Sequence, residues 1–244
     1  MTIARVVGAE LLDALAPDDP AALRSRRDLR RVHRAMGTRS LLRRDLTGLI
    51  IDADRSAPLR VLELGAGDGS LMLGLARSVA SAWPPVELSL LDRQPLVSDE
   101  TIAAYAALGW RAARRVDDVL DWAGPAAGER GGRWDLIVAN LFLHHFSSAQ
   151  LVRLLGAVAA RSNAFFACEP RRGWLALAGS HLVGALGANA VTREDAVLSV
   201  HAGFRDRELS ALWPASSDGW QVREYAAGPF SHCLRATRTG AGAA

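Results

Sequence analysis

The stretch VLELGAGDGS, residues 61–70, decides the predicted fold. Its first residues are mostly apolar, as in a short buried strand, and three glycines follow at every second position. Ser70 then begins a segment with helical periodicity. A strand that enters a glycine-rich turn and then a helix leaves backbone N–H groups beside the turn, where a ligand can approach closely. The stretch therefore predicts a ligand-binding loop at the carboxyl end of a strand.

Strand-like and helical segments alternate after this point, which predicts a doubly wound, mostly parallel α/β sheet with right-handed crossovers. We expect parallel strands over residues 60–64, 86–91, 110–116, 134–139 and 164–168. We expect helices between them over residues 70–80, 98–108 and 148–160. Two later strand-like segments, 220–225 and 230–237, are joined by a short Gly-Pro turn and predict a C-terminal antiparallel hairpin. The expected sheet therefore has seven strands.

The organisation along the chain predicts two parts. Residues 1–58 have a helical pattern, and we expect them to form an N-terminal lid or cap. We expect residues 59–244 to form the α/β core. Within the core, about residues 173–212 show only helical signals and are expected to be an insertion on the substrate side. Residues 21–60 are rich in arginine and form either a solvated helix face or a functional element, that is, a lid or an arm that contacts an anion.

Composition excludes some classes of protein. The formal charge of +3 is too small to indicate nucleic-acid binding by itself. Two cysteines are too few for a disulfide framework, and no basic, apolar leader opens the sequence, so we expect a cytoplasmic protein. The uncharged stretch 174–192 approaches the length of a membrane span, but it contains polar residues and glycines, so no membrane span is expected.

Two acids restrict the ligand of the glycine loop. Asp92 ends the second expected strand, 23 residues after Gly69, where a carboxylate can accept both hydroxyls of a ribose. Glu63 stands two residues before the first glycine, and a carboxylate there disfavours a pyrophosphate and suits a cationic ligand. These residues predict a nucleoside-containing, positively charged ligand.

Residues 63–69 resemble the first motif of class I S-adenosylmethionine (SAM)-dependent methyltransferases, Glu/Asp-x-Gly-x-Gly-x-Gly. The resemblance covers about residues 58–237 and implies a Rossmann-like sheet and SAM as cofactor. It also implies that the acid near the adenine amine is Asp118, with Asp117 as the weaker alternative; Asp118 could instead cap a helix. The implied cofactor contacts are Glu63, Gly65, Ala66, Gly67, Asp92, Arg93, Asp118 and Asn140.

The catalytic candidates are histidines. The fourth strand ends in ANLFLHHF, residues 139–146, which resembles the Leu-His-His segments of small-molecule methyltransferases. A phenol acceptor must lose a proton, and His144 or His145 suits that task near neutral pH, with His201 as a further candidate base. Glu169 is either a base or the partner of a neighbouring arginine, Arg171 or Arg172, and we favour the ion pair.

The predicted function is SAM-dependent methyl transfer to a small molecule, at a hydroxyl of an aromatic, quinone-like or polyketide-type acceptor. The competing hypotheses are C-methylation of such a ring, a protein or RNA methyltransferase, and a non-catalytic cofactor-binding scaffold. The chain lacks the Asn/Asp-Pro-Pro-Tyr/Phe signature of base-amine methyltransferases, so no nucleic-acid partner is expected. No metal site is expected, because the adjacent histidines lack partners at ligand spacing. A homodimer is left open.

Overall fold

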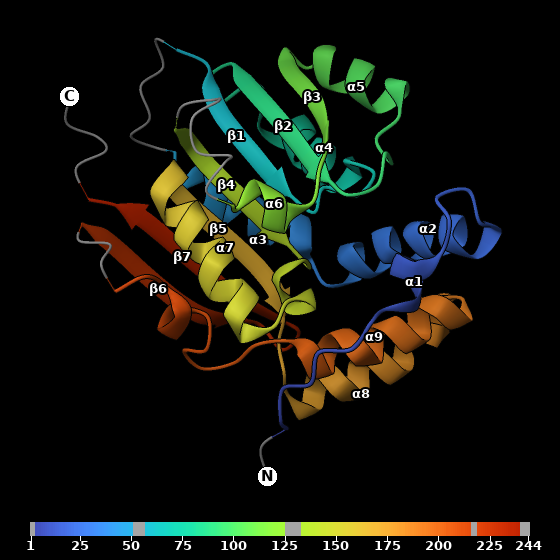
Figure 1. Cartoon of the computed structure of the whole chain (residues 1–244). Helices are drawn as coiled ribbons and strands as arrows, with labels where there is room; N and C mark the ends of the chain where they lie inside the picture. The colour runs from blue at the N-terminus through green and yellow to red at the C-terminus, as the bar shows by residue number, and fades with distance from the viewer. Residues whose placement is uncertain (1–2, 51–56, 125–132, 216–218, 240–244) are drawn as a thin grey trace.

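The computed structural model describes residues 3–50, 57–124, 133–215 and 219–239. A single sheet lies in the middle of the core with helices on both faces (Figure 1). Its seven strands have the order β3-β2-β1-β4-β5-β7-β6. They are β1 (Leu59–Leu64), β2 (Val86–Asp92), β3 (Trp110–Val116), β4 (Trp134–Asn140), β5 (Ser162–Pro170), β6 (Trp220–Ala227) and β7 (Ser231–Arg238).

Helices connect the strands and cover the sheet. Those before β1 are α1 (Leu11–Ala14), α2 (Pro20–Ala35) and α3 (Thr38–Thr47). Those of the alternating core are α4 (Ser70–Val79), α5 (Asp99–Ala106), α6 (Val119–Trp122), the 3-10 helix η2 (Leu143–His145) and α7 (Ser148–Arg161). Those after β5 are α8 (Trp174–Leu182), the 3-10 helices η3 (Val183–Leu186) and η4 (Ser210–Leu212), and α9 (Ala190–Ala202).

The strand directions confirm the predicted seven-stranded, mostly parallel sheet. Strands β1 to β5 pair in parallel, and β7 pairs antiparallel with both β5 and β6, as expected for the hairpin. Leu64 of β1 is in register with Leu91 of β2 on one side and with Ala139 of β4 on the other. The chain order reverses between β1 and β4, and ligands of open α/β sheets bind at such a point, outside the carboxyl ends of the strands.

Two apolar layers hold the sheet between the helices. On one face, Met72 and Leu75 of α4 and Tyr105 of α5 are almost fully buried. Leu42 and Leu46 of α3 join that layer, so this helix packs on the core although it lies within the predicted lid region. A buried leucine contributes about 2 kcal/mol, so α3 is held firmly against the sheet. The predicted boundary at residue 58 is not tested, but residues before Thr38 are the part that lies apart from this layer.

The N-terminal segment and the helical insertion pack together beyond the carboxyl ends of the parallel strands (Figure 1). The carboxylate of Asp195 in α9 accepts hydrogen bonds from the backbone N–H groups of Leu11 and Leu12, at 2.7 and 3.0 Å. Asp28 of α2 accepts from the backbone N–H of Asn189, at 2.9 Å. The first 35 residues are therefore tied to the insertion by specific hydrogen bonds.

The uncharged stretch 174–192 is divided between α8, η3 and the beginning of α9, with Gly187 in the left-handed region at φ +79°. Across the described ranges, no helix is both long enough and apolar enough to cross a membrane.

Candidate functional site

The glycine loop between β1 and α4 has the backbone conformation that the motif requires. Gly65, Gly67 and Gly69 have φ values of +67°, +55° and +71°. A Cβ atom at Gly67 would meet no atom within 4 Å, so the backbone there faces open space. The N–H of Gly67 donates to Oδ2 of Asp92 at 2.8 Å, and the N–H of Gln94 donates to Oδ1 at 2.9 Å. Asp92 thus braces the loop at the end of β2.

Two buried polar atoms beside the loop have no hydrogen-bond partner among the described residues: Oε2 of Glu63 and Oδ1 of Asn140. Glu63 is 4% exposed and Asn140 is 8% exposed, at the carboxyl ends of the neighbouring strands β1 and β4. Burial raises the pKa of Glu63 to about 8, and the negative charges of Asp68 and Asp92 act in the same direction. A buried acceptor pair of this kind favours a ligand that brings N–H donors and positive charge.

The expected adenine contacts lie on the same edge of the sheet but already have partners. Asp118 caps α6, where its Oδ1 accepts from the N–H of Leu120 at 2.7 Å. Arg93 donates to the backbone carbonyl of Asp13 at 3.0 Å and lies 3.1 Å from its carboxylate. Ala66 packs within the loop. The cofactor roles of Asp118, Arg93 and Ala66 are not tested by these contacts and stay predictions.

The turn after β4 is organised around Glu169, which is fully buried at the end of β5. Its carboxylate accepts from the backbone N–H groups of Phe142 (3.1 Å) and Leu143 (2.9 Å), and from the ring of His144 at 2.8 Å through Nδ1. The first N–H groups of a helical turn lack partners within that turn, so a buried carboxylate there satisfies them. Glu169 therefore fixes the position of η2 and of the His144 ring.

The expected ion pair between Glu169 and Arg171 or Arg172 is wrong. Arg172 pairs instead with Glu208 and donates to the backbone carbonyl of Ile3 at 2.9 Å. Arg171 donates to the carbonyl of Gly228 at 3.1 Å. The sequence shows that the charged residues are adjacent, but it does not show that the backbone N–H groups of η2 need an acceptor. These N–H groups donate to the carboxylate of Glu169.

The two adjacent histidines converge on Glu10, which the sequence had not indicated. Nε2 of His144 lies 3.2 Å from Oε1 of Glu10, and Nε2 of His145 lies 4.0 Å from Oε2. Asp13 lies 3.7 Å from Nδ1 of His145, and the hydroxyl of Ser199 donates to Glu10. Glu10, His144 and His145, called the histidine cluster below, are brought together only by the docking of the N-terminal segment.

The two imidazoles differ in their electrostatics. Burial alone would lower the pKa of His144, but its hydrogen bonds to Glu10 and Glu169 outweigh that cost and raise its pKa to about 9. The pKa of His145 is lowered, first by burial and then by the positive charge of the neighbouring His144. His145 is therefore the histidine of the cluster that is neutral near pH 7 and can accept a proton.

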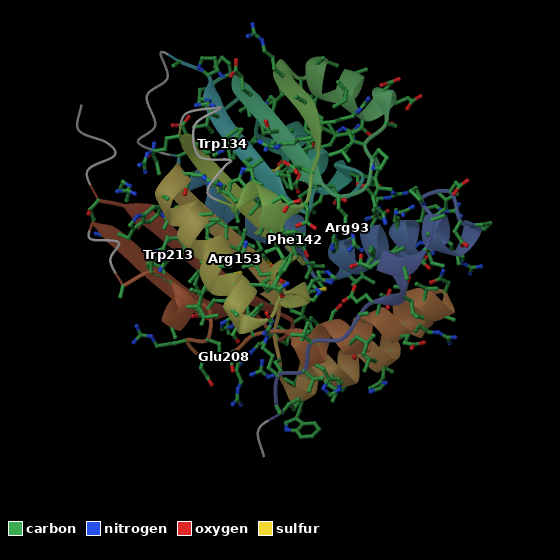
Figure 2. All side chains as sticks on the ribbon, viewed as in Figure 1. Arg93, Trp134, Phe142, Arg153, Glu208 and Trp213 are labelled. Carbon is green, nitrogen blue, oxygen red and sulfur yellow. The ribbon has the colours of Figure 1, made fainter. Side chains whose placement is uncertain are left out.

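Phe142, labelled near the middle of the molecule in Figure 2, lies against both the glycine loop and the histidine cluster. A Cβ atom at Gly65 would lie only 2.2 Å from Cδ2 of Phe142, so the ring rests directly on the loop. The same ring lies 6.4 Å, centroid to centroid, from the imidazole of His145. One aromatic side chain thus separates the expected cofactor site from the expected acceptor site.

His201 is not part of this cluster. It lies in the last turn of α9, where its backbone carbonyl accepts from the N–H of Val6 at 3.1 Å. Among the described residues its imidazole makes no hydrogen bond or ion pair with the cluster. Its catalytic role stays a prediction that the contacts do not support.

His33 of α2 is a further side chain that the sequence analysis missed. Its Nε2 is buried without a hydrogen-bond partner in the described ranges, and burial lowers its pKa to about 4, against the opposing effect of Asp68. Arg30, one turn earlier, forms an ion pair of 2.7 Å with Asp68 in the glycine loop. Helix α2 therefore covers the loop directly. A histidine in an Arg-rich helix carries no sequence signal of such a contact.

No known family model matches the sequence, and no curated protein matches it either. Similar solved structures do exist. The plantazolicin methyltransferase BpumL, in complex with a monoazolic desmethylPZN analogue and SAH, has a TM-score of 0.60 at 14% identity, covering 90% of this chain and 91% of that one. Magnesium protoporphyrin IX methyltransferase (ChlM) from Synechocystis PCC 6803 with bound SAH has a TM-score of 0.51 at 15% identity, covering 84% and 83%.

A putative O-methyltransferase from Nostoc punctiforme PCC 73102 has a TM-score of 0.59 at 13% identity, covering 96% of this chain and 64% of that one. At such low identity these similarities establish the fold. The chain has the Rossmann-like fold of class I methyltransferases, as the glycine motif predicted.

Proposed function

We propose that the protein is a SAM-dependent methyltransferase of small molecules. The observation that carries this proposal is the arrangement at the sheet edge. An open, glycine-lined loop braced by Asp92 lies beside the buried side chain of Glu63, whose Oε2 has no partner among the described residues. The histidine cluster lies next to the loop, across Phe142. Solved structures with this fold contain SAM or its product SAH, which supports the choice of cofactor.

The cofactor-binding residues suit the parts of SAM that they would contact. Asp92 would accept the ribose hydroxyls while it holds the loop, and the backbone at Gly65 and Gly67 would lie against the amino-acid end. The carboxylate of Glu63 and the amide oxygen of Asn140 are acceptors for the ammonium group of that end. When bound, SAM supplies a methyl group on a sulfonium, which is already an activated electrophile.

The acceptor is proposed to be a hydroxyl on an aromatic, quinone-like or polyketide-type molecule. A hydroxyl must lose its proton to become a good nucleophile, and neutral His145 would take that proton. Helix α2 and the helical insertion would exclude water from the reacting groups. C-methylation of an activated ring would take place at the same edge of the sheet and would depend less on a base. A protein or RNA acceptor, and cofactor binding without turnover, are competing hypotheses that the same fold could serve.

A methyl-transfer screen tests the proposal. The purified full-length protein is incubated with SAM and a panel of phenols, hydroquinones and hydroxylated polyketides, and the products are analysed by mass spectrometry. Each acceptor is paired with its own methyl ether as control. We expect the mass of one methylene to be added to at least one free hydroxyl compound and to none of the ethers. Methylation of the ethers would indicate a carbon acceptor, and methylation of protein or RNA alone would overturn the small-molecule proposal.

A cytoplasmic location and a homodimer stay predictions. The described cysteines, Cys168 and Cys233, are both buried and unlinked, although they face each other in the register of β5 and β7.

A further inference from the structure

We propose that the histidine cluster is a binding site for a divalent zinc ion, with Glu10, His144 and His145 as its three protein ligands. One donor atom from each of the three side chains lies within 4.8 Å of the others. The site lies on the acceptor side of Phe142, and its use in catalysis rests on the proposed methyltransferase function. The binding of the metal does not depend on that function.

The hydrogen bonds of Glu169 dictate which nitrogen of His144 is free. The carboxylate of Glu169 already accepts backbone N–H bonds from the turn after β4, so it is an acceptor toward His144 as well. Nδ1 of His144, at 2.8 Å, must therefore carry the proton that is donated to it. In the neutral ring, Nε2 then presents a lone pair to Oε1 of Glu10, 3.2 Å away. Two acceptors that face each other need a cation between them, either a proton or a metal ion.

The position of His145 favours the metal ion over the proton alone. Its Nε2 also points to Glu10, but at 4.0 Å from Oε2 it is too far for a direct hydrogen bond. Its ring centroid lies only 4.2 Å from that of His144, so two imidazoles and one carboxylate surround the same small space. A proton can join only two of these groups, whereas a tetrahedral zinc ion accepts all three. In a tetrahedral zinc site the donor atoms lie about 3.3 Å apart, so the widest pair here, at no more than 4.8 Å, would contract by up to about 1.5 Å.

The surroundings of the two histidines also fit a metal site. A histidine that binds a metal usually donates its other ring N–H to a carboxylate, which fixes the orientation of the ring. Here Glu169 holds Nδ1 of His144 at 2.8 Å, and the carboxylate of Asp13 lies 3.7 Å from Nδ1 of His145. Two imidazoles and one carboxylate leave a fourth position for an outside ligand. His145, with 22% of its side chain exposed, leaves this position reachable from solvent.

A zinc ion here would serve the proposed reaction. With zinc bound, Nε2 of His145 would be a ligand and could not act as the base. A hydroxyl at the fourth position would instead have its pKa lowered by the nearby positive charge and would lose its proton to water at neutral pH. The resulting oxygen anion forms the new bond to the methyl carbon of SAM. The carbon–sulfur bond breaks, and the sulfur keeps its electron pair as SAH leaves.

Direct titration with zinc tests the site. Untagged full-length protein is treated with EDTA, freed of chelator, and titrated with ZnCl₂ by calorimetry. The variants are Glu10→Gln and His145→Ala, both at side chains that are partly exposed. The matched control is His181→Ala, an exposed histidine of α8 outside the cluster. We expect one zinc ion per chain in the wild type and in the control, and a loss of affinity of at least about 100-fold in each cluster variant.

Absence of stoichiometric zinc binding, or equal binding in the wild type and both cluster variants, would overturn the proposal. Circular dichroism of each variant shows whether it is folded, and a variant that is unfolded is replaced by Glu169→Gln. This change keeps an oxygen that can accept from the N–H groups of η2. We expect it to lower zinc affinity by about 10- to 100-fold, because the ring of His144 is then oriented less well. A parallel titration with SAM separates the two proposals. Zinc binding without SAM binding would overturn the proposed methyltransferase function. SAM binding without zinc binding would overturn the proposed metal site.

Discussion

The two halves of the candidate site are built in different ways. The cofactor half is local: Glu63, Gly65 and Gly67 lie within five consecutive residues, and Asp92 follows at the end of the next strand. The acceptor half is assembled from distant parts of the chain, since Glu10 and His144 are 134 residues apart. A local half can be recognised in the sequence, whereas an assembled half depends on how the N-terminal segment docks. Variants in the two halves should therefore affect different steps.

The largest expected effect lies in the acceptor half. His145→Ala should lower turnover about 100- to 10,000-fold, because it removes the group that takes or organises the acceptor proton. The affinity for SAM should stay nearly unchanged, because His145 lies on the other side of Phe142 from the glycine loop. Turnover and SAM binding are measured on the same preparation. A collapse of SAM affinity as well would make His145 structural, and His201→Ala tests the remaining candidate base in the same assay.

In the cofactor half, Asp92→Ala should weaken SAM binding about 100-fold or more, because two charge-assisted hydrogen bonds to the ribose are lost. The loop also loses its brace at Gly67. The control is Asp99→Ala, an acid of α5 whose side chain is 93% exposed. The dissociation constants of the two variants are compared by calorimetry. An unchanged affinity for SAM in Asp92→Ala would show that Asp92 does not bind the ribose.

Alanine variants of two glycines with the same backbone conformation distinguish the cost of backbone strain from the cost of a steric clash. Gly65 and Gly37 have φ values of +67° and +68°. A Cβ atom added at Gly65 would collide with the ring of Phe142, whereas a Cβ atom added at Gly37 would meet no atom within 4 Å. Gly37→Ala should reduce the free energy of unfolding by about 1 kcal/mol through backbone strain. Gly65→Ala should lose about 2–4 kcal/mol, because the ring must also move. Equal losses in urea unfolding would show that Phe142 does not rest on the loop.

A further expected effect concerns the pH dependence of stability that is set by Glu63. Its pKa of about 8 in the folded chain lies above the ordinary carboxyl value of 4.5. Between these values the folded chain holds a proton that the unfolded chain has lost, so stability should fall as pH rises from about 5 to about 8. Glu63→Gln should remove that slope in urea unfolding. A ligand ammonium at Glu63 should displace the proton, so SAM binding near pH 7 should release close to one proton in the wild type and none in the variant.

The release of that proton is measured by calorimetry in buffers of different ionisation enthalpy. A wild type that releases no proton would contradict the contact between Glu63 and the charged end of the cofactor.

The fold could be predicted almost completely, because buried parallel strands read as apolar segments and the glycine loop fixes where the sheet binds its ligand. The expected edges of β1, β2 and β4 differ from the observed ones by one residue. The role of Glu169 could not be predicted, since its partners are backbone N–H groups exposed only after η2 has formed. Glu10 and His33 could not be found either, because nothing in their neighbours indicates where α1 and α2 dock.

The most direct test of the account is calorimetric titration of the purified chain with SAM, SAH and NADH. The proposed function predicts micromolar binding of SAM and SAH, with one ligand per chain, and no binding of NADH, because the buried Oε2 of Glu63 favours a cation over a pyrophosphate. Binding of NADH with no binding of SAM or SAH would contradict it and would assign the glycine loop to a dinucleotide.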